Sequence, residues 1–384
     1  MQFEFTTTTR ILFGSGKLKI IGSLAGEFGK RALIVSGCPE AISDQLVNLL
    51  EQYKITSSTI RINQEPTVDS IRRLVDYAKQ SPIDMVIGIG GGSALDSAKV
   101  ASALACNPGD VMDYLEVIGL HKPLSFSSIP LIAIPTTSGT GSEVTKNAVL
   151  GSPQHHVKVS LRSPYLVPKI ALVDPELTLS LPPALTAFTG LDALTQLIEP
   201  YTCNEPNPLI DALCQEGLQR VARSLLQAYD QGSDLQARED MSLASLFSGI
   251  SLANARLGAV HGLAGPLGGE IPAPHGAICA SILPYVMEAN LTALHARSND
   301  HPALERYHTI GKILTGSTTA SAFSAVQWVR DFCQYAKIPS LSDYGLTEAE
   351  FDKIVTKSSK ASSMKGNPIT LSGPELRNIL QKSL

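Results

Sequence analysis

The segment at residues 85–99 constrains the fold more than any other part of the sequence. It reads MVIGIGGGSALDSAK, so an apolar run of strand length leads directly into three glycines and then into a helical pattern. A nearly continuous apolar strand is typical of a parallel sheet with both faces covered. Three glycines expose backbone N–H groups at the amino terminus of the following helix, an arrangement that holds pyrophosphate. We therefore expect a phosphate-binding loop in an α/β domain, with a tight ligand-free turn as the alternative.

The order of strand and helix patterns predicts the architecture. Besides the apolar run at 85–89, β-rich runs occupy 32–36, 58–62 and 131–134, and helical patterns lie between them at about 40–53, 67–80 and 93–105. This alternation indicates βαβ units and a parallel sheet. After Pro182-Pro183 helical periodicity dominates, with helices expected near 237–256, 276–294, 319–336 and 347–362. We predict a dinucleotide-binding α/β domain over residues 1–178 and an all-helical domain over residues 179–384.

A second loop strengthens the interpretation of the first. PTTSGTGSEVT, at 135–145, follows the predicted strand 131–134 directly. Hydroxyls and glycines at the carboxyl end of a strand lie where ligands bind in open parallel sheets. Two such loops on one sheet indicate a nucleotide cofactor across the crevice. Ser93 and Asp96 also fit a helix capping box, which is the structural alternative for these two residues.

Composition excludes several classes of protein. The chain has 35 acidic and 31 basic residues, a net charge of −4, which argues against a nucleic-acid partner. We expect no membrane association, since we see no apolar run near the roughly 20 residues of a span. The start MQFEFTTTTR is unlike a signal peptide, and the six cysteines form no C-x-x-C pair and are expected to fill the core. Charged residues make up only 17% of the chain, which favours a subunit interface. We expect a cytoplasmic homo-oligomer.

Segments in both halves of the chain together resemble the iron-containing (group III) alcohol dehydrogenase family, a relative of glycerol dehydrogenase and dehydroquinate synthase. The resemblance implies catalysis in a cleft between two domains, with hydride transfer between NAD(P) and a small alcohol or aldehyde, usually assisted by a divalent metal. The matching segments are GGGSALDSAK at 90–99, PTTSGTGSEVT at 135–145, Lys158, DPELTLSLPP at 174–183, TGLDALTQLIEPY at 189–201, GAVHGLAGPLGG at 258–269, PHGAICASILP at 274–284 and Asn367-Pro368.

The resemblance also implies which residues bind the cofactor. Together with Asp96 of the glycine loop, they are Gly91, Gly92, Ser93, Thr136, Thr137, Thr140, Thr145, Asn147 and Lys158. NAD-preferring members of the family commonly end the first strand with an aspartate, where this chain has Gly37. A carboxylate there would repel the 2′-phosphate of NADP, so its absence admits either NAD or NADP.

The implied metal site departs from the family pattern. The family's ligands are one aspartate and three histidines; the corresponding residues here are Asp192, Gln196, His261 and His275. Asp192 and Gln196 are four residues apart and share a helix face. An amide is a weaker ligand than imidazole, so affinity for Fe or Zn should fall, although one carboxylate and two histidines still suffice for Fe(II). A histidine that the family often carries is Gly265 here. We expect His261 and His275 to be the catalytic residues.

Other functions remain open at this point. The altered site could belong to a metal-independent NAD(P)H-dependent carbonyl reductase, with a histidine as proton donor. A lyase of the dehydroquinate synthase type needs a basic pocket, and Arg256 is the only Lys or Arg near 250–280. A nucleotide-binding protein without catalysis is a third possibility. Taken alone, Asp192 and Gln196 fit a solvated helix face, His261 a core histidine and His275 a helix cap.

Overall fold

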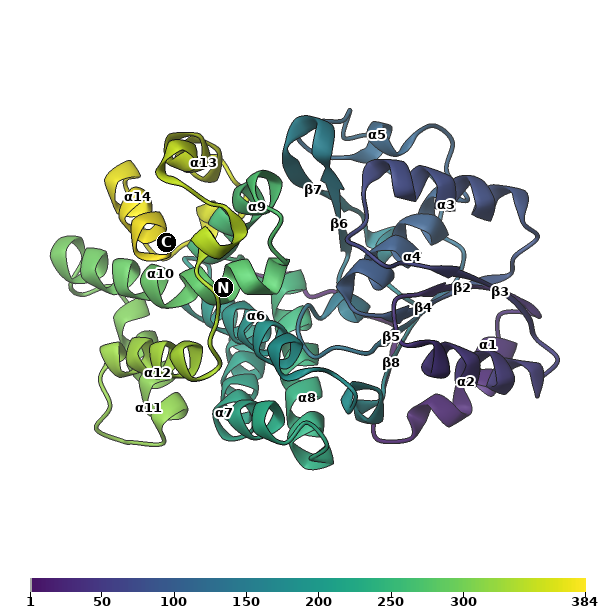
Figure 1. Ribbon diagram of the computed structural model, residues 1–384, viewed down its shortest axis with the longest axis horizontal. Coiled ribbons are helices and arrows are strands. Elements are labelled where there is room, and N and C mark those ends of the chain that lie inside the picture. Colours follow the sequence, from purple (N-terminus) through teal and green to yellow (C-terminus); the bar gives the residue numbers. More distant parts are fainter. Residues whose placement is uncertain (1) are drawn as a thin grey trace. The chain divides into compact units, whose positions relative to one another are not determined.

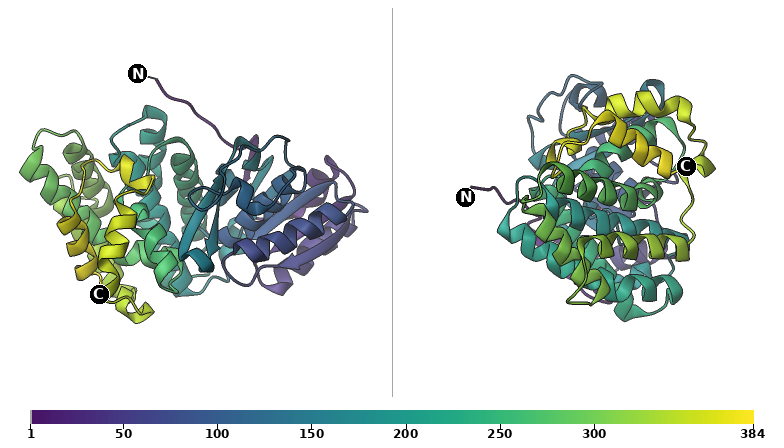
Figure 2. Two further views of the ribbon diagram at one scale, coloured as in Figure 1. Left: turned by 90° about the horizontal axis from the view of Figure 1, so that it is seen from above. Right: turned by 90° about the vertical axis from the view of Figure 1, so that its left-hand side faces the viewer.

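The computed structural model describes residues 2–384, which divide into two units. One unit comprises Thr6–Ser180 and contains the parallel sheet; the other comprises Leu181–Leu384 with residues 2–5 and is helical (Figure 1). The predicted fold class is confirmed. Figure 2 shows the same contrast by colour, with strands in the purple and blue part of the chain and only helices and their connections in the green and yellow part.

Six parallel strands form the main sheet of the first unit, in the order β1-β8-β5-β4-β2-β3. The four predicted strands are present, while β1 and β8 at one edge are short and were not predicted. The strands are β1 (Arg10–Phe13), β2 (Arg31–Ser36), β3 (Thr56–Arg61), β4 (Met85–Gly90), β5 (Leu131–Pro135) and β8 (Ile170–Val173).

The strand order defines where a ligand can enter. β2 pairs with β3 on one side and with β4 on the other, and the sheet then extends from β4 through β5 and β8. The order therefore reverses between β2 and β4. In open α/β sheets ligands bind outside the carboxyl ends of the strands at such a reversal. Gly37 follows β2 and the three-glycine segment ends β4, so both lie at this point.

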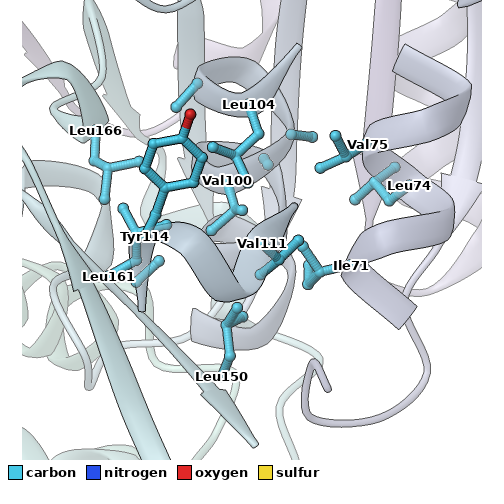
Figure 3. Close-up of a cluster of buried hydrophobic side chains, with 14 of the residues drawn as sticks. Ile71, Leu74, Val75, Val100, Leu104, Val111, Tyr114, Leu150, Leu161 and Leu166 are labelled. Atoms are coloured by element: carbon cyan, nitrogen blue, oxygen red, sulfur yellow. The ribbon is translucent and has the colours of Figure 1, made fainter. Parts of the chain in front are cut away.

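Helices cover both faces of the sheet (Figure 1). α1 (Ile21–Gly26) and α2 (Glu40–Glu51) lie on one face, and α3 (Val68–Gln80), α4 (Gly92–Leu104) and α5 (Val111–Tyr114) lie on the other. Alternate β2 residues enter the two cores: Leu33 and Val35 pack with α3 and α4, and Ile34 packs with α1 and α2. The first of these cores, drawn in Figure 3, also holds Tyr114 on α5. Burial on both faces explains why these strands are apolar throughout.

An antiparallel ribbon is added to this unit. β6 (Asn147–Ser152) pairs with β7 (Val157–Arg162), and β6 also contacts α4. Leu150 and Val159 are paired across the ribbon and are both buried in the core that includes α4. The ribbon thus brings Asn147 and Lys158 to the side of the sheet that carries the glycine loop.

The second unit consists of nine α-helices and short 3₁₀ turns among the described residues. Helices near the predicted positions 237–256 and 276–294 are present as α8 and α10, whereas the other two predictions were too long. The helices are α6 (Pro183–Thr202), α7 (Pro208–Asp230), α8 (Leu235–Asn254), α9 (Ala259–Glu270), α10 (His275–Arg297), α11 (Ala303–Thr315), α12 (Ala322–Tyr335), α13 (Phe351–Ser358) and α14 (Gly373–Lys382).

Helix α10 is the one helix of the described chain that by its own length and apolar composition could cross a membrane, which was not expected from the sequence. Helices α8 and α9 pass the same test only as a pair, which is bent by 93°. In the structure 78% of its apolar window is buried inside the protein. This is the burial expected of a core helix in a globular unit. Its apolar composition is therefore explained by packing against α6, α9, α12 and α14.

Candidate cofactor loops and metal centre

The glycine segment brings the ends of β4 and β2 unusually close. Gly90 has a φ of +148°, a backbone conformation that residues other than glycine rarely adopt. A Cβ atom at Gly90 would lie 2.8 Å from Cβ of Ala94 and 3.0 Å from Cα of Gly37. The N–H of Gly37 donates to the carbonyl of Ile89 at 2.8 Å. Bare backbone therefore lines the point where the strand order reverses, as a phosphate site requires.

The capping box that was the structural alternative for Ser93 and Asp96 does not form. α4 begins at Gly92, with Gly91 as its N-cap, and no side chain caps it. The Asp96 carboxylate instead accepts from Oγ of Ser142 at 2.6 Å and from the N–H of Val149 at 2.9 Å. Asp96 therefore connects α4 to the second loop and to β6. An amino terminus without a side-chain cap is what anion binding needs.

The second loop packs directly on the first. A Cβ atom at Gly92 would lie 2.8 Å from Cγ2 of Thr140, and one at Gly91 would lie 3.3 Å from Cγ2 of Thr137. Thr136 donates its backbone N–H to the carbonyl of Gly90 at 3.0 Å. The structure thus brings together Gly91, Gly92 and these three threonines, which the sequence analysis assigned to one site.

Lys99 ends the glycine-rich segment GGGSALDSAK, but no role was predicted for it. Its side chain is fully buried, and Nζ donates to Oγ1 of Thr145 at 2.7 Å and to the carbonyl of Asn147 at 2.9 Å. Lys99 therefore holds two of the predicted cofactor residues in place. Lys158 is placed differently, since its Nζ pairs with Oε2 of Glu65 at 2.5 Å. The cofactor roles of all these residues stay predictions.

Glu143 of the second loop should make stability depend on pH. Burial raises the pKa of its carboxyl to about 7 from 4.5, although a backbone hydrogen bond and Lys99 oppose this. The folded state then binds this proton more tightly than the unfolded state, so the free energy of unfolding falls as pH rises from 4.5 to 7. Between pH 4.5 and pH 7, the free energy of unfolding of Glu143→Gln should therefore rise by about 1–3 kcal/mol relative to that of the parent protein. Urea unfolding of both proteins at the two pH values measures this difference.

Glu348→Gln, at an exposed position, is the matched control for this measurement. It should leave the pH dependence of unfolding as it is in the parent protein. If Glu143→Gln and the parent lose stability equally between pH 4.5 and pH 7, the carboxyl of Glu143 does not titrate in this range and the prediction is wrong.

The predicted metal residues come together in the helical unit. Asp192 on α6, His261 on α9 and His275 at the start of α10 meet at one place. Oδ1 of Asp192 lies 3.7 Å from Nε2 of His261 and 3.8 Å from Nε2 of His275. The side chains of Asp192 and His261 are 2% and 8% exposed, whereas that of His275 is 36% exposed. The site is therefore buried on one side and open on the other.

Two of these atoms support a metal-binding role. Among the described residues, Oδ1 of Asp192 and Nε2 of His261 are buried without a hydrogen-bond partner. Buried polar atoms normally have such a partner, and a missing ion is one explanation for an exception. A carboxylate oxygen and two imidazole nitrogens are suitable ligands for Fe or Zn. The residues present therefore fit the divalent metal that the family resemblance implies.

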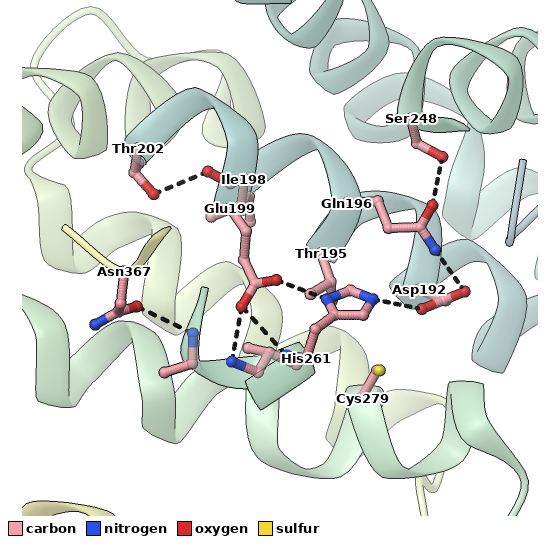
Figure 4. Close-up of polar contacts among 12 residues, drawn as sticks. Asp192, Thr195, Gln196, Ile198, Glu199, Thr202, Ser248, His261, Cys279 and Asn367 are labelled. Atoms are coloured by element: carbon pink, nitrogen blue, oxygen red, sulfur yellow. Dashed lines mark hydrogen bonds and ion pairs between the residues drawn. The ribbon is translucent and has the colours of Figure 1, made fainter. Parts of the chain in front are cut away.

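Glu199 belongs to this site, although the sequence analysis missed it. Its Oε2 lies 2.6 Å from Nδ1 of His261, and its Oε1 accepts from the N–H of Val260 at 2.7 Å (Figure 4). A carboxylate on one imidazole nitrogen fixes the ring and directs the other nitrogen at a metal. The signal was available, since Glu199 follows Asp192 by seven residues and shares its helix face.

The charges of the site favour a bound cation. Burial alone lowers the pKa of His261, but the carboxylates of Glu199 and Asp192 raise it to about 10. Burial raises the pKa of Asp192, yet its histidine neighbours outweigh this and leave that pKa below its ordinary value. Two buried carboxylates thus surround one imidazole. A divalent cation at Nε2 of His261 would balance them.

Gln196 uses its amide for hydrogen bonds inside the protein. Nε2 donates to Oδ2 of Asp192 at 2.8 Å, and Oε1 accepts from Oγ of Ser248 on α8 at 3.2 Å (Figure 4). The opposite amide orientation would place the carbonyl oxygen against a carboxylate. Gln196 therefore holds one oxygen of Asp192 and leaves the other facing the histidines. Its assignment as a metal ligand stays a prediction.

Gly265, where the family often carries a histidine, lies within α9 one residue before Pro266. A Cβ atom added there would meet nothing within 4 Å. Nothing in the packing therefore demands glycine by close contact. A proline disfavours the helical backbone conformation in the residue before it, and glycine tolerates this restriction at position 265.

Comparison with known proteins agrees with this arrangement. Residues 8–175 match the family described as iron-containing alcohol dehydrogenase, and residues 186–384 match the C-terminal domain of the Fe-containing alcohol dehydrogenase family. The chain is 34% identical to alcohol dehydrogenase 4 of Schizosaccharomyces pombe over 379 residues, 97% of this chain and 87% of that relative.

Solved structures extend the likeness over the whole chain. A 1,3-propanediol oxidoreductase is 30% identical, with a TM-score of 0.91 and 100% of both chains covered. A sulfoacetaldehyde reductase from Bifidobacterium kashiwanohense, in complex with NAD⁺, is 26% identical, with a TM-score of 0.85 and 100% and 99% of the two chains covered. On these matches and this site, the chain belongs to the iron-containing alcohol dehydrogenase family.

Proposed function

We propose that the protein transfers a hydride between NAD(P) and a small alcohol or aldehyde, assisted by a divalent metal. As a member of an alcohol dehydrogenase family it is an oxidoreductase. The observation that carries the metal-assisted proposal is the pair of buried, unpartnered ligand atoms, Oδ1 of Asp192 and Nε2 of His261, beside His275. NAD(P) supplies the hydride acceptor or donor, and the metal supplies a Lewis acid for the substrate oxygen.

The residues of the chain position these groups. The glycine segment with Thr137 and Thr140 would hold the cofactor phosphates, while Lys99 and Asp96 keep the two loops together. Glu199 fixes the ring of His261 through Nδ1, and Gln196 fixes Asp192 through Oδ2. The half-exposed ring of His275 is the group of the site that solvent reaches, so it is suited to pass a proton between substrate and solvent when it does not hold metal.

Cofactor preference is predicted from Gly37. Position 37 has no carboxylate to repel a 2′-phosphate, so we expect NADP(H) to be accepted at least comparably to NAD(H), and Gly37→Asp to shift preference toward NAD(H). A Cβ atom at Gly37 would lie 2.9 Å from Cβ of Ala94, so Gly37→Ala is the matched control for packing. Steady-state kinetics with both cofactors measures the ratio. Rejection of NADP(H) by a hundredfold, about 2.7 kcal/mol, would contradict the prediction.

One experiment tests the function against its rivals. Bound metal and NAD(P)H oxidation are measured over a panel of aldehydes and keto acids, before and after chelation. Turnover that is lost on chelation and returns with metal supports the proposal. Turnover that survives exhaustive chelation favours a metal-independent reductase, with His261 or His275 as proton donor. Cofactor binding without turnover of any substrate would indicate a binding protein.

A lyase of the dehydroquinate synthase type is less favoured. Arg256, the basic residue on which a phosphate pocket would depend, is paired to Glu205 at 2.8 Å and is 46% exposed.

We further propose that the protein is cytoplasmic and a homo-oligomer, and that it needs neither nucleic acid nor membrane. The low charged fraction of 17% supports an interface between copies.

A further inference from the structure

Cys279 on α10 joins the candidate metal cluster. Its Sγ lies 3.6 Å from Nε2 of His275, one helical turn earlier on the same helix. One ligand atom each from Asp192, His261, His275 and Cys279 lies within 4.8 Å of all the others. In Figure 4 the sulfur points from α10 toward His261 and Asp192. From the sequence alone, this cysteine was expected to fill the core.

Three of the six distances between the four ligand atoms are close to those of a tetrahedral zinc site, and the other three are no longer than 4.8 Å. Zinc bonds of about 2.0–2.1 Å to nitrogen and about 2.3 Å to sulfur set neighbouring ligand atoms roughly 3.3–3.7 Å apart. The three distances from Asp192 to the two histidines and from His275 to Cys279 are 3.7, 3.8 and 3.6 Å. Side-chain movements that shorten the longest of these distances by about 1 Å would bring all four atoms into coordination distance.

Gln196 leaves a position to be filled. Its N–H faces Asp192 and its carbonyl oxygen accepts from Ser248, so the amide turns its donor side, not its oxygen, toward Asp192. The second observation is independent of Cys279: two buried polar atoms, on Asp192 and His261, lack partners and face the same place. A cysteine thiolate is a stronger ligand than an amide oxygen and a softer one than imidazole.

We propose that Cys279 is a ligand of the metal in this chain, so that Asp192, His261, His275 and Cys279 form the site and select zinc over iron. The proposal rests on the metal-assisted function proposed above. On binding, the Cys279 thiol loses its proton to solvent and its sulfur forms the bond to the metal. Gln196 is then a positioning residue, which acts through Asp192. Zinc held by these four residues would supply a Lewis acid for the substrate oxygen, because zinc can expand its coordination.

Cobalt substitution of the full-length protein tests the proposal. The purified chain is stripped with a chelator, loaded with Co²⁺ and examined for a near-ultraviolet thiolate-to-cobalt charge-transfer band. The parent protein should show the band at one cobalt per chain. Cys279→Ser should lose it and, in a competition assay, lose more zinc affinity than the roughly 10- to 100-fold caused by changes behind metal ligands. Gln196→Ala should keep the band, since the amide is not a ligand.

Cys214→Ser is the matched control. Cys214 is equally buried, on α7, and its Sγ lies 3.4 Å from Oγ of Ser251, away from the cluster. This variant should keep the band and the zinc affinity of the parent. If Cys279→Ser does not fold, the absence of the band from the parent protein would still overturn the proposal.

Each contrary result has its own meaning. Cobalt uptake by the parent without a charge-transfer band would overturn the ligand role of Cys279, while metal-dependent turnover would still support the proposed function. A charge-transfer band that persists in Cys279→Ser would also overturn the ligand role of Cys279. A parent protein that takes up no cobalt and keeps its turnover after chelation would overturn both proposals.

Discussion

Gly92→Val is expected to abolish NAD(P)H binding, weakening it at least about 100-fold, while the fold survives. The first atom of the new side chain would lie 2.8 Å from Cγ2 and 3.1 Å from Oγ1 of Thr140. The branched side chain would therefore push the second loop away and occupy the approach of the pyrophosphate to the first turn of α4. Fluorescence titration with NADH and NADPH measures the effect, and circular dichroism checks the fold.

Gly26→Val controls for a glycine-to-valine change in the same unit. Gly26 ends α1, and an added Cβ atom there meets nothing within 4 Å. It should bind both cofactors as the parent does. If Gly92→Val also binds NAD(P)H with the affinity of the parent, the phosphate-loop assignment is wrong.

His261→Ala is expected to abolish metal retention, with a loss of affinity beyond the roughly 10- to 100-fold caused by changes in the residues behind metal ligands. The variant removes a proposed ligand from the cluster and also the imidazole that Glu199 contacts at 2.6 Å. A buried carboxylate left without its partner should cost about 3–5 kcal/mol of the free energy of unfolding. Metal analysis after gel filtration and urea unfolding measure the two effects.

His295→Ala removes a histidine from the exposed end of α10 and is the matched control. It should retain metal and stability as in the parent protein. Normal metal content in His261→Ala would exclude this histidine as a ligand. Turnover in His261→Ala at the parent rate, with no metal in either protein, would exclude the Lewis-acid mechanism.

The architecture was predictable because its causes are local. Strands such as 85–89 are apolar throughout since helices cover both faces of the sheet, and a run of this length followed by glycines has few alternatives. The composition and order of the two loops likewise predicted their place at the carboxyl ends of β4 and β5. Asp192 and His261 were predicted to be metal ligands because the motifs around them resemble those of the iron-containing alcohol dehydrogenase family.

The tertiary structure decided how those residues are used. Asp96 reads as a helix cap in sequence, but Ser142 and the N–H of Val149 approach it from segments about 50 residues away. Lys99 looks like an exposed helix residue, yet the ribbon of β6 and β7 buries it against Thr145. Such contacts depend on how distant elements pack, and no local pattern encodes them.

The same distinction between sequence and tertiary structure applies to the metal centre. The sequence by itself determined that one carboxylate and two histidines are available and that Gln196 replaces the third histidine. Only the packing of α6, α8, α9 and α10 turned the Gln196 amide toward Asp192 and Ser248, placed Glu199 behind His261 and directed Cys279 into the cluster. Side-chain identity determines what a residue can bind, whereas the direction of its lone pairs is determined by neighbours that the chain supplies from elsewhere.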